Sequence, residues 1–180
     1  MLQGEKVQLR RLEPTDIDFI MQWVNDPEVT KWLSFVWPVS RKSEEEWLDR
    51  ASKADDPSDQ ILAVETKDGT YIGQVGLHKI DYISGIAELG IVIGRKDYWG
   101  QGYGSDALRT LIRFAFSQLR LRKLLLTYYG DNKRAEKCYL RLGFKEVGRL
   151  KDHMLRGGKF QDIVYMELFA EDFRKEDENA

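Results

Sequence analysis

Six residues of the chain, Gly100 to Ser105, have the composition of a phosphate-binding turn. Three glycines alternate with other residues there, between an apolar run and an amphipathic segment. Glycine has no Cβ atom, so consecutive backbone N–H groups can converge on an anion, and the positive end of a following helix adds roughly 0.3–1 kcal/mol of favourable field. The turn therefore predicts a binding site for a phosphate-bearing molecule.

The residues around this turn predict strands before it and a helix after it. Lys67-Asp68-Gly69-Thr70 separates two alternating runs, which is a strong hairpin signal, and a third run follows. Apolar residues between Ala107 and Leu119 recur at helical spacing. We expect about seven strands in an α/β (α+β) fold, over residues 6–12, 61–66, 71–80, 86–93, 123–129, 144–152 and 160–169.

Further helices are predicted by their capping residues. Thr15 is a candidate cap for a helix that Asn25-Asp26-Pro27 ends, and Ser43 opens a second helix. A third helix begins near Ser105, and a fourth extends from Asp131 or Asn132 to Gly143. No repeat or linker divides the chain, so we expect one domain over residues 1–180, with a frayed tail after about 172.

Composition excludes several classes of function. The 28 Lys and Arg residues balance 30 Asp and Glu residues, so no basic field favours nucleic acid as a partner. A single cysteine, Cys138, excludes a disulfide framework and a cysteine-based zinc site, and two histidines make no case for a metal. The chain starts without a signal peptide and has no apolar run that could span a bilayer, so we expect a cytoplasmic protein without a membrane partner.

Three kinds of phosphate-bearing ligand are candidates for the glycine turn. Gly102 to Ala107 fits the dinucleotide pattern G-x-G-x-x-A, but antiparallel hairpins precede it and too little chain follows for a doubly wound domain. A P-loop fails because no Gly-Lys-Ser/Thr follows the glycines. The third ligand is coenzyme A, for which the order of the elements matters: meander, glycine turn, helix, strand, short helix and closing hairpin.

Four segments, which share this order, carry a resemblance to a known family: Trp23–Val29, Tyr98–Gly104, Asn132–Phe144 and Gly157–Asp162. From Val7 to Leu168 the chain resembles the GNAT acetyltransferase superfamily. Within it, the chain is similar to the branch that contains ribosomal-protein N-terminal (alanine or serine) acetyltransferases and spermidine N-acetyltransferases. The resemblance implies a mixed, mostly antiparallel sheet flanked by helices, and direct acetyl transfer from acetyl-CoA to an amine.

The resemblance also implies which residues bind acetyl-CoA. Its pantetheine arm would pair with the backbone of Ile91, Val92 and Ile93, and one N–H group there would polarise the thioester carbonyl. The other implied positions are Trp99, Gly100, Gln101, Gly102, Tyr103, Gly104, Ser105, Asn132, Ala135 and Arg141. Trp99 stands where the family often has Arg or Gln, which we expect to tune the affinity.

Two side chains are the candidates for catalysis. Tyr139 lies seven residues after Asn132, two helical turns, so both can face one groove; by resemblance Tyr139 protonates the departing thiolate. Glu88 matches a carboxylate that often acts on the amine, directly or through water. The structural alternatives are a helix cap for Asn132, core packing for Tyr139 and a solvated carboxylate for Glu88. We favour a buried apolar role for Cys138 and assign none to His78 or His153.

The sequence leaves the acceptor open. We expect a protein N-terminal amine, with polyamine or aminoglycoside acetylation as the alternative and a CoA-binding module without turnover as the non-enzymatic one. The aromatic stretch from Glu28 to Ser58 could line a pocket or only cap the core, and the oligomeric state is open. Carboxylates that could bind a cationic acceptor are Asp26, Glu28 and Glu44 to Glu46. Positively charged residues that flank the glycine turn and could neutralise phosphates are Arg95, Lys96, Lys133 and Arg134.

Overall fold

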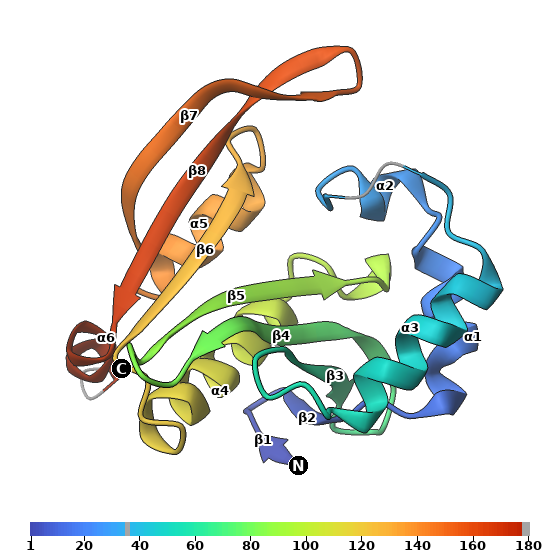
Figure 1. Ribbon diagram of the computed structural model, residues 1–180, viewed down its shortest axis with the longest axis horizontal. Coiled ribbons are helices and arrows are strands. Elements are labelled where there is room, and N and C mark those ends of the chain that lie inside the picture. Colours follow the sequence, from blue (N-terminus) through green and yellow to red (C-terminus); the bar gives the residue numbers. More distant parts are fainter. Residues whose placement is uncertain (35–36, 178–180) are drawn as a thin grey trace.

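A mixed sheet of eight strands forms the frame of the protein in this computed structural model, which describes residues 1–34 and 37–177 (Figure 1). The strand order is β1-β2-β3-β4-β5-β6-β8-β7, and only the β5–β6 pair of these described strands is parallel. The strands are β1 (Leu2–Gln3), β2 (Val7–Arg11), β3 (Gln60–Thr66), β4 (Tyr71–Asp81), β5 (Ile86–Ile93), β6 (Lys123–Tyr129), β7 (Lys145–Arg156) and β8 (Lys159–Phe169). The mixed, mostly antiparallel architecture expected from the sequence is confirmed.

The strand that the sequence did not predict is β1. It has two residues, and it pairs with β2 through Leu2 and Leu9. Two residues are too few to show an alternating pattern, so this pairing depends on the adjacent β2. The other seven strands match the expected ones in order and approximate position.

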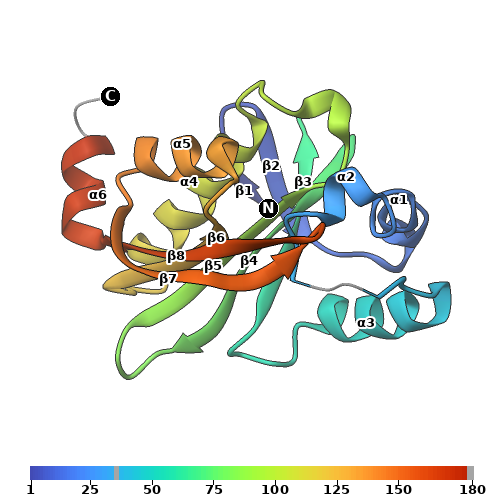
Figure 2. The same cartoon turned by 90° about the horizontal axis from the view of Figure 1, so that it is seen from above.

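Helices cover both faces of the sheet. They are η1 (Pro14–Asp16), α1 (Ile17–Trp23), α2 (Pro27–Thr30), α3 (Arg41–Lys53), η2 (Lys96–Tyr98), α4 (Tyr103–Ser117), α5 (Lys133–Arg141) and α6 (Ala170–Asp177). On β5, Ala87 and Leu89 join a core cluster with the buried side of α4, whereas Val92 packs with Trp23 and Leu48 of α1 and α3. Because successive strand residues point to opposite faces, α4 and the α1–α3 layer lie on opposite faces of the sheet (Figure 2).

Helix starts differ from the expected ones where caps decide them. Ser40 accepts a hydrogen bond from the Ser43 N–H, so α3 begins at Arg41 and not at Ser43. Asp26 caps α2 in the same way and Pro27 occupies its first turn, so the residues expected to end one helix also start another. A cap and a stop share the same residue types, so sequence alone favours neither.

The C-terminal segment also differs from expectation, because residues 170–177 form α6 where a frayed tail was expected after about 172. Phe173 is buried and packs against Phe116 of α4, with the ring centroids 5.8 Å apart. A single buried aromatic ring anchors this helix, which the high charge of the tail conceals in the sequence.

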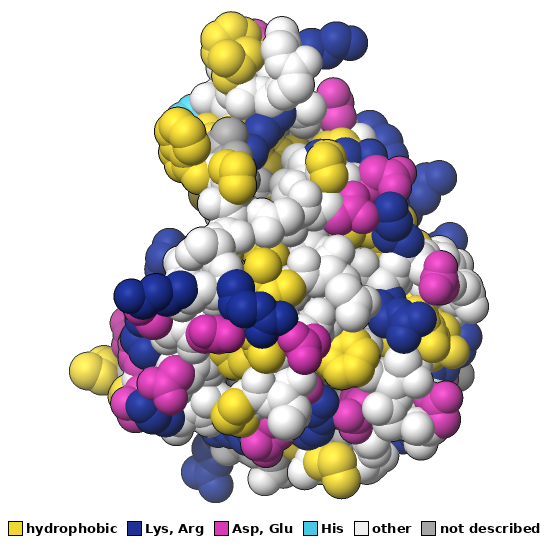
Figure 3. All heavy atoms as spheres, turned by 90° about the vertical axis from the view of Figure 1, so that its right-hand side faces the viewer, with side chains coloured by type: hydrophobic (Ala, Val, Ile, Leu, Met, Phe, Trp, Pro, Cys, Tyr) yellow, Lys and Arg dark blue, Asp and Glu magenta, His cyan; other side chains and the backbone are white. Residues whose placement is uncertain are grey.

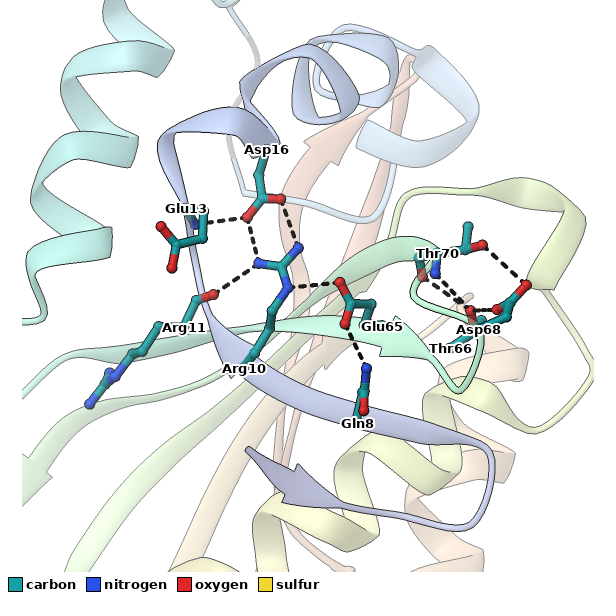
Figure 4. Close-up of polar contacts among 9 residues, drawn as sticks. All are labelled: Gln8, Arg10, Arg11, Glu13, Asp16, Glu65, Thr66, Asp68 and Thr70. Carbon is teal, nitrogen blue, oxygen red and sulfur yellow. Dashed lines mark hydrogen bonds and ion pairs between the residues drawn. The ribbon is translucent and has the colours of Figure 1, made fainter.

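A polar network fixes the first helical layer to the sheet (Figure 4). The guanidinium of Arg10 on β2 donates two hydrogen bonds of 2.8 Å to the buried carboxylate of Asp16 and a third, also 2.8 Å, to Glu65 on β3. Bidentate charge-assisted bonds of this kind hold a geometry firmly. The network therefore sets where α1 starts relative to β2 and β3.

The sheet divides between β5 and β6. The register of this pair extends only from Ile86–Lys123 to Glu88–Leu125, whereas β5 continues to Ile93 and β6 to Tyr129 (Figure 1). Beyond Glu88 the two strands separate, so the backbone of β5 has an open edge facing β6. No helix among the described residues is long and apolar enough to cross a membrane.

Candidate active site

A cavity of about 1140 Å³ occupies the gap between the separated strands. Glu88, Gly90 and Val92 line it from one face of β5, and Ile91 and Ile93 line it from the other. The cavity therefore passes through the split sheet, from the α4–α5 face to the face that carries α1 to α3. Figure 3 shows this second side of the molecule, where cationic and anionic side chains are interspersed.

The glycine turn lies at one end of this cavity, between η2 and α4. Gly100 and Gly102 have φ angles of +73° and +87°, a region that side chains with a Cβ rarely adopt, and Gly102 caps α4. The helix begins at Tyr103, two residues earlier than expected. The first N–H groups of α4 have no partner within the helix, so an anion at this end would meet several donors.

Most of the residues expected to bind acetyl-CoA or to catalyse lie together around this cavity. Those that line it are Glu88, Ile91, Val92, Ile93, Trp99, Gly100, Gly102, Gly104, Ser105, Asn132, Ala135, Tyr139 and Arg141. Within the described chain, Gln101 and Tyr103 lie outside its lining. Tyr103 lines a separate cavity of about 420 Å³, and the Gln101 carbonyl accepts a hydrogen bond from Lys6.

Trp99 connects three parts of the cavity wall. Its indole N–H donates to the Ile93 carbonyl at 2.7 Å, and the Arg134 guanidinium of α5 lies 4.1 Å from the ring centroid. Aromatic rings attract cations placed over their faces. Trp99 thus joins β5, the glycine turn and α5, and it occupies one carbonyl that the pantetheine arm was expected to use.

Asn132 and Tyr139 face the cavity from α5, as their spacing predicted. Asn132 caps the helix, because its side-chain oxygen accepts from the Ala135 N–H at 3.1 Å, and its amide N–H groups remain available as donors. The Tyr139 ring packs against Tyr128 and Phe144. Burial raises the pKa of Tyr139, which keeps its hydroxyl protonated and able to donate.

Cys138 packs against the main core cluster, as expected, but it is only half-buried and also lines the cavity. Its thiol lies 3.1 Å from the Ser105 hydroxyl, and burial raises its pKa. A raised pKa keeps the thiol protonated, whereas nucleophilic catalysis needs a thiolate.

The carboxylates that line the cavity are largely different from those expected. Asp26 and Glu28 are bound by Lys96, and the hydrogen bond from Lys96 is the main cause of the lowered pKa of Asp26. Three described carboxylates line the cavity: Asp56, Asp59 and Glu88. The acidic run from Asp55 to Asp59 was the available sequence signal for the first two, and sequence reasoning did not use it.

Glu88 is less free to act as a base than the resemblance implied. One of its oxygens accepts a hydrogen bond from the Lys79 ammonium at 2.9 Å, which raises the pKa of Lys79. The ion pair engages the Oε1 atom of Glu88, and the second carboxylate oxygen can still attract another cation.

The aromatic stretch from Glu28 to Ser58 was expected either to line a pocket or to cap the core, and its residues do both. Trp32 and Leu33 line the cavity, whereas Trp47 packs in the second core cluster and Trp37 is 85% exposed. Phe35, part of the same prediction, lies outside the described residues.

One pair of cavity residues was missed entirely. His78, to which we assigned no role, has its Nδ1 atom 2.6 Å from Oδ1 of Asp59. The two residues lie on separate elements, 19 positions apart, so no local motif signals their contact.

Comparisons with known proteins agree with this geometry. The family model described as an acetyltransferase (GNAT) domain matches residues 6–145. The chain is 30% identical over 179 residues to "Putative ribosomal N-acetyltransferase YdaF" of Bacillus subtilis (strain 168), with 96% of each chain covered. It is 28% identical over 180 residues to spermidine N(1)-acetyltransferase of Escherichia coli (strain K12), covering 98% of this chain and 92% of the other.

A solved structure extends the similarity to three dimensions. The spermidine N-acetyltransferase of Vibrio cholerae, in complex with CoA and spermine, superposes with a TM-score of 0.86 at 26% identity, over 95% of this chain and 99% of the other. The chain belongs to the GNAT acetyltransferase family and is an acetyl-CoA-dependent N-acetyltransferase.

Proposed function

We propose that this enzyme acetylates a primary amine of a small polycationic acceptor, of the polyamine class, by direct attack in a ternary complex. The observation that carries the proposal is the position of Asp56, Asp59 and Glu88, all of which line the cavity. Glu88 lies five strand residues from Ile93, roughly 17 Å from the turn end at the usual rise. The glycine turn and the carboxylates thus lie at different ends of the cavity.

The division of the cavity suits the two substrates. The phosphates of acetyl-CoA would bind at the glycine turn, and the pantetheine arm would follow the open edge of β5 past Asn132. The thioester would then lie near Tyr139, which protonates the departing thiolate. On the opposite side of the sheet, one ammonium group of a polyamine would replace Lys79 at Glu88 while another amine attacks the thioester.

The polyamine class thereby takes precedence over the protein N-terminal amine that we first expected. The spermidine acetyltransferase named above, with its bound CoA and spermine, supports this order. One observation favours the protein N-terminus as a second candidate: Val29, Trp32 and Leu33 give part of the cavity an apolar wall that suits a peptide side chain.

A panel of acceptors separates the two candidates. Free-thiol release from acetyl-CoA is measured with spermidine, spermine, an aminoglycoside and peptides with N-terminal alanine or serine. We expect release with the polyamines, and we expect Asp56→Asn to raise KM for spermine while the affinity for CoA stays unchanged. Turnover with the peptides alone would replace the polyamine proposal with N-terminal acetylation.

A further inference from the structure

The strongest unexplained feature of the cavity is the pair formed by His78 and Asp59. The Asp59 carboxylate lies 2.6 Å from the Nδ1 atom of the ring, so the Nε2 atom is on the side of the ring that faces away from Asp59. A carboxylate on one ring nitrogen fixes the orientation and tautomer of an imidazole, and it stabilises the imidazolium that forms when the other nitrogen takes a proton. The side chains are 36% and 49% exposed, so an acceptor in the cavity can reach them.

Two glycines make room for this ring. Gly76 of β4 and Gly90 of β5 are opposite each other in the sheet. A Cβ atom on Gly90 would lie 2.9 Å from Nε2 of His78, and one on Gly76 would lie 3.1 Å from it. The imidazole therefore lies over a floor of bare backbone, on the face of β5 that also carries Glu88 and lines the acceptor side of the cavity.

An irregularity in β4 adjoins the histidine. His78 pairs with Glu88, but the next pair is Asp81 with Ile86, so β4 has one extra residue. Within this bulge Lys79 has a φ of +49°, a strained conformation for a residue with a Cβ atom. The Lys79 ammonium binds Glu88, so the same bulge places the histidine and engages the rival carboxylate.

The contact between His78 and Asp59 is not needed to hold the loop that carries Asp59 in place. The loop that carries Asp59 is already attached to β4 by the Ile80 N–H, which donates to the Ser58 carbonyl at 2.9 Å. The Tyr82 hydroxyl also donates to the Pro57 carbonyl, and Gln60 pairs with Leu77 at the start of β3. These contacts attach the loop to β4 without the imidazole.

We propose that His78 is the general base of this acetyltransferase and that Asp59 is its positioning residue. The proposal rests on the proposed function, because it requires an amine acceptor. An alkyl amine with a pKa near ~10.4 enters as an ammonium ion and must lose a proton before it can attack. His78 accepts that proton at Nε2 and passes it to solvent.

The remaining bonds balance as follows. The amine nitrogen attacks the thioester carbonyl carbon, an N–C bond forms and the C–S bond breaks. The nitrogen releases its second proton, and the thiolate takes one from the Tyr139 hydroxyl, which that second proton restores through solvent. One proton is released for each acetyl group transferred. Asp59 keeps the imidazole aligned throughout and is not itself protonated.

Variants with matched acceptors test the dyad. Purified His78→Gln and Asp59→Asn are compared with wild type and with Asp55→Asn, an exposed neighbour that changes the same charge. With spermidine we expect His78→Gln to lower kcat about 10²–10⁴-fold with little change in KM. We expect Asp59→Asn to lower kcat less and also to raise KM, because Asp59 is one of the carboxylates that would attract the acceptor. A shift in melting temperature on addition of CoA verifies that each variant is folded.

The decisive comparison uses an amine that needs no base. With trifluoroethylamine, which is largely neutral at pH 7, the loss caused by His78→Gln should be much smaller, and added imidazole should partly restore turnover of His78→Ala with spermidine. Equal losses with both amines, or full turnover in His78→Gln, would overturn the dyad while the proposed function stands. A wild-type enzyme that acetylates none of the amines would overturn the proposed function, and the dyad with it.

Discussion

Tyr139 combines a packed aromatic ring with a position on the cavity wall. Its contacts with Tyr128 and Phe144 fix the ring, and its desolvation keeps the hydroxyl protonated. A fixed ring and a protonated hydroxyl allow this group to donate a proton, whereas the raised pKa also makes it a weaker acid than an ordinary tyrosine. A core tyrosine with no such role would have the same ring contacts, so kinetics must separate the two roles.

Replacing Tyr139 with Phe removes the hydroxyl that we propose as the proton donor and keeps the ring. We expect kcat to fall about 10²–10⁴-fold while the dissociation constant for CoA, measured by calorimetry, changes little. Tyr128→Phe is the control, because it alters a neighbouring ring whose hydroxyl donates to Glu136. Wild-type turnover in the Tyr139→Phe enzyme would refute its role as the acid.

Glu44 gives a prediction about pH. Burial raises its pKa, so the folded state binds the proton more tightly than the unfolded state does. The charged form therefore lowers stability as pH rises past the ordinary value of 4.5. We expect Glu44→Gln to melt at a higher temperature than wild type at pH 7 and at the same temperature once Glu44 is protonated in both states.

The control for this change is Glu46→Gln on the same helix, because Glu46 is exposed. Its effect on the melting temperature should be small and nearly independent of pH. A gain for Glu44→Gln that persists unchanged below pH 4 would show that the cause is not the titration of this carboxyl.

At the scale of the element, the glycine turn works through backbone conformation. Gly100 has open space around its Cα atom, but its φ of +73° disfavours any residue with a Cβ atom. The need for glycine there is therefore conformational and not steric.

Gly100→Ala should strain the turn by about 1–2 kcal/mol, which corresponds to a loss of CoA affinity of roughly 5- to 30-fold. Gly148→Ala is the matched control, because Gly148 also has no atom within 4 Å of a built Cβ and has no positive φ. The two CoA dissociation constants decide the matter: equal values would mean that the turn does not depend on its left-handed backbone.

At the scale of the whole molecule, the divided sheet couples stability to the donor. β5 belongs to one part and β6 to the other, and beyond Glu88 the cavity occupies the gap between these two strands. A molecule that binds in this gap contacts both parts at once, and it binds the folded state alone.

CoA at one hundred times its dissociation constant should stabilise the fold by about 2.7 kcal/mol, which raises the melting temperature by roughly 5–10 °C for a chain of this size. NAD tests the dinucleotide interpretation excluded above and should cause no shift. Calorimetric scans with each ligand provide the measurement, and an equal shift with NAD would contradict the assignment of the cavity to CoA.

Local features made much of the fold and of the donor site predictable. Gly100 and Gly102 adopt positive φ angles, which glycine favours whatever its neighbours are. Asn132 and Tyr139 face the same cavity because the helical repeat places residues seven positions apart on one side. Strand periodicity likewise predicted seven of the eight strands. β1 and α6 were not predicted, because their conformation depends on packing against β2 and Phe116, which are distant in the sequence or invisible to a local pattern.

What the sequence by itself determined, then, is a glycine turn, a helix that presents an amide and a phenol to the same cavity, and the family to which the chain belongs. The use of these groups on the donor side is our proposal. Only the tertiary structure decided which charged side chains pair and which of them line the cavity. It showed that Lys96 forms ion pairs with Asp26 and Glu28, and that Lys79 forms one with Glu88. It also showed that the Asp59 carboxylate contacts the His78 ring. Charged side chains choose partners by distance in space, and those distances arise from strand register and loop packing across the whole chain.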